Sequence, residues 1–116
     1  MHEYGIAYDI FATARKAALD NKATLVTIIH VDLGEVAMVN PEQVGFLFSV
    51  IAAEEPLFAG ARLACRNVPA VGRCGCGYEG PETFVCPRCG ALPELIQGRE
   101  IVVTSVEIEV ADSLAC

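Results

Sequence analysis

The sequence predicts an α+β fold, in which two helices pack on a three-stranded sheet and a small cysteine-rich domain is inserted at one edge. Apolar residues recur at helical spacing in two segments, and three other segments are rich in β-branched residues. Between the last two of these, residues 72–98 form a stretch of different composition, rich in Gly, Pro and Cys. We therefore expect residues 1–71 and 99–110 to form one discontinuous α/β domain, residues 72–98 an inserted domain, and residues 111–116 a flexible tail.

Two amphipathic helices are predicted. The first covers residues 2–21, where these apolar residues share one side: Ile6, Ala7, Ile10, Phe11, Ala14, Ala17 and Ala18. The second begins after Asn40, a good N-cap residue, with Pro41 in its first turn, and Pro56 ends it. Its apolar residues recur at i, i+3, i+4, i+7 and i+8, which places them on one face: Val44, Leu47, Phe48, Ile51 and Ala52.

Three strands are predicted, over residues 23–33, 61–71 and 100–110. The first would present alternate residues to one face: Leu25, Thr27, Ile29, Val31 and Leu33. Val26 and His30 would lie on the other face. In the second strand, Pro69 is expected near an end or at an edge, because proline cannot donate a ladder hydrogen bond. In the third, Glu107 and Glu109 alternate with apolar residues and are expected to face outward.

The charge balance and the N-terminus limit the classes of partner and compartment. The formal net charge is −7, which argues against nucleic acid and anionic membranes as main partners. No apolar run is long enough to span a bilayer, and the opening residues lack the pattern of a signal peptide. We therefore expect a cytoplasmic protein whose cysteines are reduced.

Four cysteines of the insert form two closely spaced pairs, Cys74-Gly75-Cys76 and Cys86-Pro87-Arg88-Cys89, each followed by glycine. Thiolates from two tight turns can converge on one tetrahedral Zn²⁺ ion, which would make the insert a zinc ribbon. A closed four-thiolate site leaves no open position for catalysis, so this zinc would be structural. A disulfide or a redox pair is the alternative, and the first pair is one residue shorter than the usual Cys-x-x-Cys.

The remaining cysteines and the internal histidine are interpreted as structural. Cys65 lies in a predicted strand and is expected to be a small buried hydrophobe. Cys116 belongs to the predicted tail. His30 lies within a predicted strand and is expected to be structural, with metal ligation as the lesser alternative.

The N-terminus can form a second kind of metal site. The amine of Met1, the backbone amide of His2 and the imidazole of His2 close adjacent chelate rings in one plane. Square-planar nitrogen ligation is typical of Ni(II) or Cu(II), and Glu3 could add its carboxylate or amide. From the residues alone this signal is weak, and a solvated histidine at a helix end is the favoured interpretation.

The ordered combination of motifs resembles the HypA/HybF family of hydrogenase nickel-incorporation proteins. The matching pieces are Met1-His2-Glu3, Cys76-Gly77-Tyr78-Glu79, Cys86-Pro87-x-Cys89-Gly90, Gly98-Arg99-Glu100 and Ser105-Val106-Glu107-Ile108-Glu109. The resemblance implies a nickel metallochaperone without enzymatic turnover, holding labile Ni²⁺ at Met1, His2 and Glu3. It also implies structural Zn²⁺ at Cys74, Cys76, Cys86 and Cys89.

The resemblance further implies partners. Members of this family work with a HypB-type nickel GTPase, deliver nickel to the maturing [NiFe]-hydrogenase large subunit, and in some organisms serve urease maturation. The sequence departs from the family pattern in two places. The first cysteine pair has the short spacing Cys74-x-Cys76, and Tyr4-Gly5 stands where the family usually has a small polar residue. The alternative function is a zinc-ribbon module for protein–protein interaction that carries no transported metal.

Overall fold

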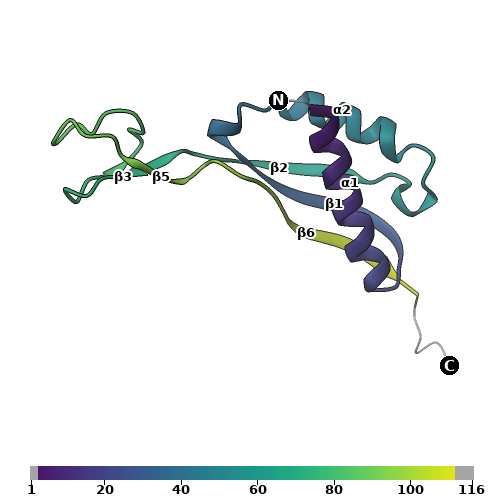
Figure 1. Ribbon diagram of the computed structural model, residues 1–116. Coiled ribbons are helices and arrows are strands. Elements are labelled where there is room, and N and C mark those ends of the chain that lie inside the picture. Colours follow the sequence, from purple (N-terminus) through teal and green to yellow (C-terminus); the bar gives the residue numbers. More distant parts are fainter. Residues whose placement is uncertain (1–2, 112–116) are drawn as a thin grey trace. The chain divides into compact units, whose positions relative to one another are not determined.

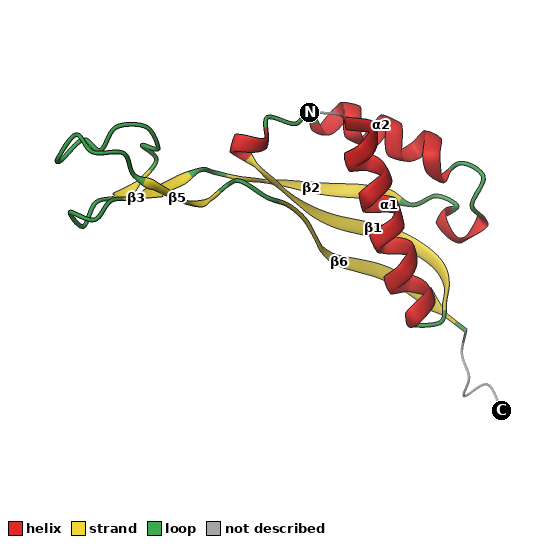
Figure 2. Ribbon diagram, viewed as in Figure 1, coloured by secondary structure: helices red, strands yellow, loops and turns green. Residues whose placement is uncertain are grey.

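The computed structural model describes residues 3–111, and the predicted α+β fold is confirmed (Figures 1 and 2). The helices are α1 (Glu3–Asp20) and α2 (Pro41–Ala52), with short 3₁₀ helices η1 (Glu35–Ala37) and η2 (Pro56–Phe58). The strands are β1 (Ala23–Gly34), β2 (Arg62–Val68), β3 (Val71–Arg73), β4 (Glu79–Gly80), β5 (Glu94–Gln97) and β6 (Ile101–Val110). They form two sheets, in the orders β2-β1-β6 and β4-β3-β5.

The chain divides into two compact units. The described residues of the first are 3–31, 40–65 and 103–111, and the second comprises residues 32–39 and 66–102. The second unit holds the whole cysteine-rich segment. The division into domains at residues 72 and 98 remains a prediction.

The core of the first unit is built where α1 and α2 meet. The rings of Phe11 and Phe58 lie 4.8 Å apart between centroids, and those of Phe48 and Phe58 lie 5.9 Å apart. Aromatic pairs at such distances add to the stabilisation that burial itself gives. Ile29 of β1 is fully buried, as is Val44 of α2. The helical periodicity therefore identified the inward faces of both helices.

The N-terminus of α2 is capped as its sequence predicts. The side-chain oxygen of Asn40 accepts hydrogen bonds from the backbone N–H groups of Glu42 (2.9 Å) and Gln43 (3.2 Å). These two donors have no partner within the helix, so the cap satisfies them. Pro41 occupies the first helical position, where a missing N–H costs nothing.

The strict alternation predicted for β1 is wrong in its first half. Ile29, Val31 and Leu33 are buried as expected, but Val26 is buried too. The hydroxyls of Thr24 and Thr27 donate to the backbone carbonyls of Glu109 and Glu107, both at 3.1 Å. These contacts are three residues apart on β1 and two apart on β6. Burial along β1 therefore does not follow one strict alternation over the whole strand.

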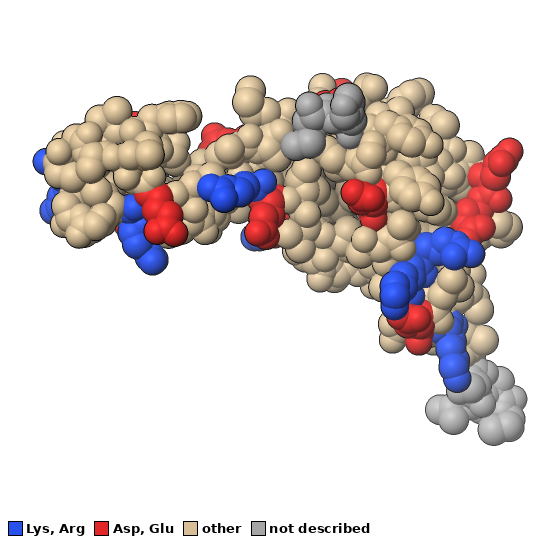
Figure 3. All heavy atoms as spheres, viewed as in Figure 1, with Lys and Arg blue, Asp and Glu red and all other residues tan. Residues whose placement is uncertain are grey.

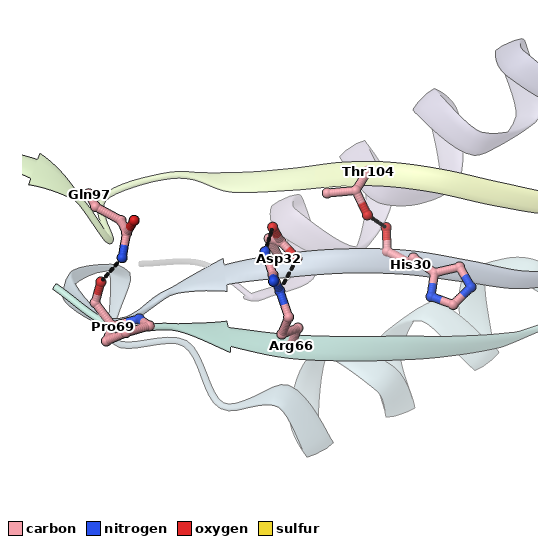
Figure 4. Close-up of polar contacts among 6 residues, drawn as sticks. All are labelled: His30, Asp32, Arg66, Pro69, Gln97 and Thr104. Carbon is pink, nitrogen blue, oxygen red and sulfur yellow. Dashed lines mark hydrogen bonds and ion pairs between the residues drawn. The ribbon is translucent and has the colours of Figure 1, made fainter.

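The second predicted strand, over residues 61–71, is interrupted in the structure. β2 ends at Val68 and β3 begins at Val71, so Pro69 and Ala70 form a break. Proline has no N–H to donate to a neighbouring strand, which explains why the ladder stops before it. The amide of Gln97 donates instead to the carbonyl of Pro69, at 3.0 Å (Figure 4).

Within the second unit, residues 34–36 contact Ala70, between β2 and β3, and Gly98, between β5 and β6. A carboxylate oxygen of Glu35 accepts from the backbone N–H of Ala70 at 2.7 Å, and Val36 N–H donates to the carbonyl of Gly98 at 2.8 Å. Gly98 has φ +96°, and a Cβ added there would lie 2.6 Å from Ala70 Cα. Only glycine fits this crossing, because it tolerates positive φ and needs no space for Cβ.

Gly98→Ala is therefore expected to destabilise the protein by about 2–5 kcal/mol, from backbone strain and a clash with backbone atoms that cannot move aside. Gly60→Ala is the matched control. Gly60 also has positive φ (+76°), but no atom lies within 4 Å of an added Cβ, so only about 1–2 kcal/mol of strain is expected. Urea denaturation measures both free energies of unfolding. Equal losses for the two variants would contradict the close approach at Gly98.

Charged side chains of both signs are mixed on the surface. On the face drawn in Figure 3, basic side chains lie beside acidic ones and form no continuous basic stripe. Among residues 3–111, neither helix combines the length and apolar character that a membrane crossing needs.

Candidate metal centre

The structure brings the thiols of Cys74, Cys76, Cys86 and Cys89 together. All four Sγ atoms lie within 4.8 Å of one another. Cys74 Sγ and Cys89 Sγ are 3.4 Å apart, and Cys76 Sγ and Cys86 Sγ are 3.6 Å apart. Tetrahedral zinc with Zn–S bonds of about 2.3 Å requires sulfur–sulfur separations of about 3.8 Å. The donor set and its spacing therefore fit a zinc ion.

Two tight turns present these thiols. In the first, Gly77 N–H donates to the carbonyl of Cys74 at 3.0 Å, and Cys74 N–H donates to the carbonyl of Tyr78 at 2.8 Å. Gly77 has φ +102°, a value that glycine adopts without strain. Cys74 follows directly on β3, so the strand fixes the start of this turn. The short Cys74-x-Cys76 spacing is thus accommodated by a hydrogen-bonded turn of its own.

The second turn repeats this design with the longer spacing. Gly90 N–H donates to the carbonyl of Cys86, and Cys86 N–H donates to the carbonyl of Ala91, both at 2.8 Å. Gly90 also has positive φ, at +77°. Residues 74–90 contain no helix. This disfavours a redox Cys-x-x-Cys, which normally lies at a helix N-terminus.

Backbone donors around Cys86 favour its thiolate. Burial raises the pKa of this thiol, but the backbone N–H groups of Cys89 and Arg88, with neighbouring thiols, outweigh burial and bring the pKa to about 6. Arg88 N lies 3.4 Å from Cys86 Sγ. For Cys89, the Ala91 N–H lowers the pKa, but the thiols of Cys74, Cys76 and Cys86 raise it to about 12. Without a cation, the cluster therefore shares its protons unevenly, and a divalent metal displaces those that remain.

The segment around these turns buries almost nothing else. Within residues 71–98, the buried side chains are those of Cys74, Cys86 and Pro93. The largest apolar side chains there point into solvent, with Phe84 82% and Leu92 76% exposed. An ion pair between Arg73 and Glu79 (2.9 Å) spans β3 and β4, but exposed pairs contribute little. Folding energy for this segment must therefore come mainly from metal ligation.

The proposed nickel ligands lie at the limit of the structure. Met1 and His2 are outside the described residues, and Glu3 is the first residue of α1. Within residues 3–111, the four cysteines are the only place where three or more metal-binding side chains meet. The structure therefore gives no geometry for an N-terminal chelate.

His30 has a structural environment. Its Nε2 lies 2.6 Å from a carboxylate oxygen of Glu107 on the neighbouring strand β6. Its backbone carbonyl accepts from the hydroxyl of Thr104 at 3.3 Å (Figure 4). These contacts agree with the prediction of a structural strand residue.

The prediction that Cys65 is buried is wrong. Cys65 is exposed, because β2 is an edge strand of its sheet and lines an open groove beside α2. Its neighbours still desolvate it in part, which raises the pKa of its thiol. Cys116, the other cysteine outside the cluster, lies beyond the described residues.

Comparison with known proteins gives matches along nearly the whole chain. A family model described as hydrogenase/urease nickel incorporation, metallochaperone, hypA matches residues 1–108. A hydrogenase maturation factor HypA of Methanocella arvoryzae is 45% identical over 114 residues, which cover 95% of this chain and all of that protein. The factor of the same name from Chlorobium phaeobacteroides is 39% identical, covering 94% of this chain and all of its own length.

A solved structure shares the fold. The solution structure of the Ni metallochaperone HypA from Helicobacter pylori has a TM-score of 0.74 and 21% sequence identity, covering 96% of this chain and all of that one. At this identity the likeness concerns the fold alone.

Proposed function

The chain belongs to the HypA family of hydrogenase/urease nickel-incorporation metallochaperones, and we propose that it binds Ni(II) at its N-terminus and delivers it during hydrogenase maturation. The observation that carries this proposal is the match to the family model from residue 1 onward, which includes both the Met1-His2-Glu3 triplet and the four cysteines.

In this proposal nickel is the transported metal, and the N-terminal residues of the chain bind it. The Met1 amine, the His2 amide and the His2 imidazole supply three nitrogens, and Glu3 stands next to them in sequence. Nitrogen donors in a plane suit Ni(II), and a site at the end of the chain can lose one ligand easily. Such a site would hold nickel firmly enough to carry it and loosely enough to release it.

Zinc would have the opposite role. Cys74, Cys76, Cys86 and Cys89 would hold it, and with all four positions taken by thiolates the ion would supply folding energy rather than chemistry. Two of these thiols are buried, which favours a site that retains its ion. The protein would thus deliver its nickel ion and retain its zinc ion.

The partners follow from the same proposal. We expect a HypB-type GTPase to take part in nickel transfer and the [NiFe]-hydrogenase large subunit to be the destination, with urease maturation proteins as further partners where a urease is present. No step of this role requires turnover by the chain itself.

Nickel titration of two forms of the protein tests the proposal. The form with a free N-terminus is expected to bind about one Ni(II) and give the yellow, diamagnetic spectrum of square-planar nickel. A form with a short Gly-Ser extension before Met1 is expected to lose this binding, because its terminal amine is displaced from His2. If neither form binds nickel and both hold zinc, a zinc-ribbon interaction module becomes the better interpretation.

The two metals are expected to respond differently to acid. Nickel must displace protons from the terminal amine, the His2 amide and the imidazole, and unperturbed amine and imidazole pKa values are about 7.8 and 6.5. The nickel-free state therefore binds more protons, so nickel affinity should fall about a hundredfold or more between pH 7.5 and 6. Zinc in its closed site should remain bound. Calorimetry with parallel zinc assays measures both, and a nickel affinity unchanged by pH would exclude amide and imidazole ligation.

A further inference from the structure

The four thiols of the cysteine cluster differ in how far solvent reaches them. Cys74 and Cys86 are buried, whereas Cys76 and Cys89 are exposed. Each of the two turns therefore contributes one buried and one exposed cysteine to the cluster. A reagent dissolved in water reaches the exposed sulfurs first, so we look for a reactive position at Cys76 or Cys89.

Backbone donors distinguish these two exposed cysteines. Cys89 accepts a hydrogen bond from the backbone N–H of Ala91, two residues further along the chain. The equivalent donor for Cys76 would be the N–H of Tyr78, but within residues 3–111 the polar contact of Cys76 Sγ is with another sulfur. Hydrogen bonds to a thiolate stabilise its charge and reduce its nucleophilicity. Cys76 is therefore the more nucleophilic of the two exposed thiolates once a metal has displaced the protons.

A guanidinium group lies beside the turn that carries Cys76. Nη1 of Arg88, an exposed residue of the second turn, would be 3.9 Å from a Cβ added at Gly77, which directly follows Cys76. A guanidinium can donate hydrogen bonds to an oxygen on which negative charge develops. The surroundings of Cys76 therefore favour its reaction with a reagent whose leaving group is an oxygen anion.

A second thiol lies close enough to Cys76 to complete such a reaction. Sγ of the buried Cys86 is 3.6 Å from Sγ of Cys76. The sulfurs of a disulfide are about 2.05 Å apart, so a small rotation of the two side chains brings these atoms to bonding distance. The two cysteines belong to different turns, and a bond between them would take two of the four ligands away from the metal.

We propose that Cys76, assisted by Arg88, is a peroxide-reactive site, and that Cys86 converts its oxidised form into a disulfide with loss of the zinc ion. The inference rests on the zinc site of the proposed function. It assigns to that site a reaction with hydrogen peroxide that the delivery of nickel does not require.

The reaction has two steps. The Cys76 thiolate attacks one oxygen of hydrogen peroxide, so that an S–O bond forms, the O–O bond breaks and hydroxide leaves beside Arg88. The Cys86 thiolate then attacks the sulfur of the resulting sulfenic acid, which forms the S–S bond and releases a second hydroxide. The two sulfurs lose two electrons in total, and the peroxide gains them. With two thiolates consumed, the site can no longer hold zinc.

Limited oxidation of the zinc-loaded protein tests which thiol reacts. Cys65→Ser and Cys116→Ser remove the thiols outside the cluster, and the zinc content is measured before peroxide is added in less than equimolar amount. After alkylation of the remaining thiols, mass spectrometry is expected to find the Cys76–Cys86 disulfide at least fivefold in excess over disulfides of Cys89, with a matching release of zinc to a chromogenic chelator.

The outcomes separate this inference from the zinc site on which it rests. A protein that holds no zinc at the start would contradict the zinc site itself. A protein that holds zinc but is oxidised first at Cys89, or equally at Cys76 and Cys89, would overturn the present proposal and leave the zinc site intact.

Variants of Arg88 test the same reaction without removing a metal ligand. Arg88→Ala is expected to slow zinc release by peroxide at least fivefold, and Arg88→Lys, which keeps the charge, less than about twofold. Alkylation of Cys76 by iodoacetamide should change little in either variant, because its leaving group is iodide. Arg73→Ala is the matched control, since Arg73 is an exposed arginine of the same unit that pairs with Glu79. Equal slowing by Arg73→Ala, or unchanged oxidation of Arg88→Ala, would overturn the proposal.

Discussion

Replacing Cys86 by Ser is expected to abolish zinc binding and unfold most of residues 71–98. Cys86 is buried, and its Sγ lies 3.6 Å from that of Cys76, so its loss removes a quarter of the ligand set from the centre of the site. In small zinc domains, ligation supplies on the order of 10–16 kcal/mol of apparent free energy. Because this segment buries no large apolar side chain, nothing else can replace that contribution.

The remainder of the chain is expected to stay folded, because the Phe11, Phe48 and Phe58 cluster and the buried face of β1 do not involve the cysteines. Zinc content should fall from about one per chain to near zero, and amide resonances of residues 71–98 should lose their dispersion. Cys65→Ser, outside the cluster, is the control and should retain zinc. A Cys86→Ser protein with one tightly held zinc would disprove the four-thiolate site.

His2→Ala is expected to lower nickel affinity by about a hundredfold or more, because it removes the imidazole and one chelate ring. Zinc content and the melting temperature should change little, since the cysteine cluster and the Phe11–Phe58 contact are built from residues far from position 2 in the sequence. Calorimetric titration of the untagged protein measures the nickel affinity, and metal analysis measures the zinc.

His30→Ala provides the control for this experiment. His30 is held by Glu107 at 2.6 Å, so its loss should leave nickel binding unchanged. Undiminished nickel binding by His2→Ala would place the cargo site elsewhere. A loss of nickel binding in the His30 variant would indicate that the nickel site lies on the sheet rather than at the N-terminus.

Short-range sequence patterns were sufficient to predict the two helices and the faces that they bury. The helical periodicity located α1 and α2, and Asn40 caps α2 as expected. Two glycine-containing turns were sufficient to predict that the four thiols converge. Chelate chemistry alone was a weak signal for the N-terminal triplet, and the ordered motifs that resemble the family singled it out. Met1 and His2 lie outside the described residues, so the nickel site stays a prediction.

Features that depend on neighbouring strands could not be predicted in this way. A strand sequence does not reveal whether the strand lies at an edge, which is why Cys65 was expected to be buried. The burial of Val26 depends on what covers β1 in the fold, and the alternation of β1 alone contains no sign of it. The contacts of Glu35 with Ala70 and of Val36 with Gly98 join segments more than thirty residues apart.

The exposure of Phe84, Val85 and Leu92 has a consequence for how this protein can evolve. These side chains are 82%, 59% and 76% exposed, so substituting them removes little packing. The outer surface of the segment is therefore free to drift as long as the cysteines and the turn glycines are kept. A lineage could acquire a new partner by changing these positions without passing through an unstable intermediate. Because the cysteines and their metal stabilise this segment, its surface residues can change without loss of the fold.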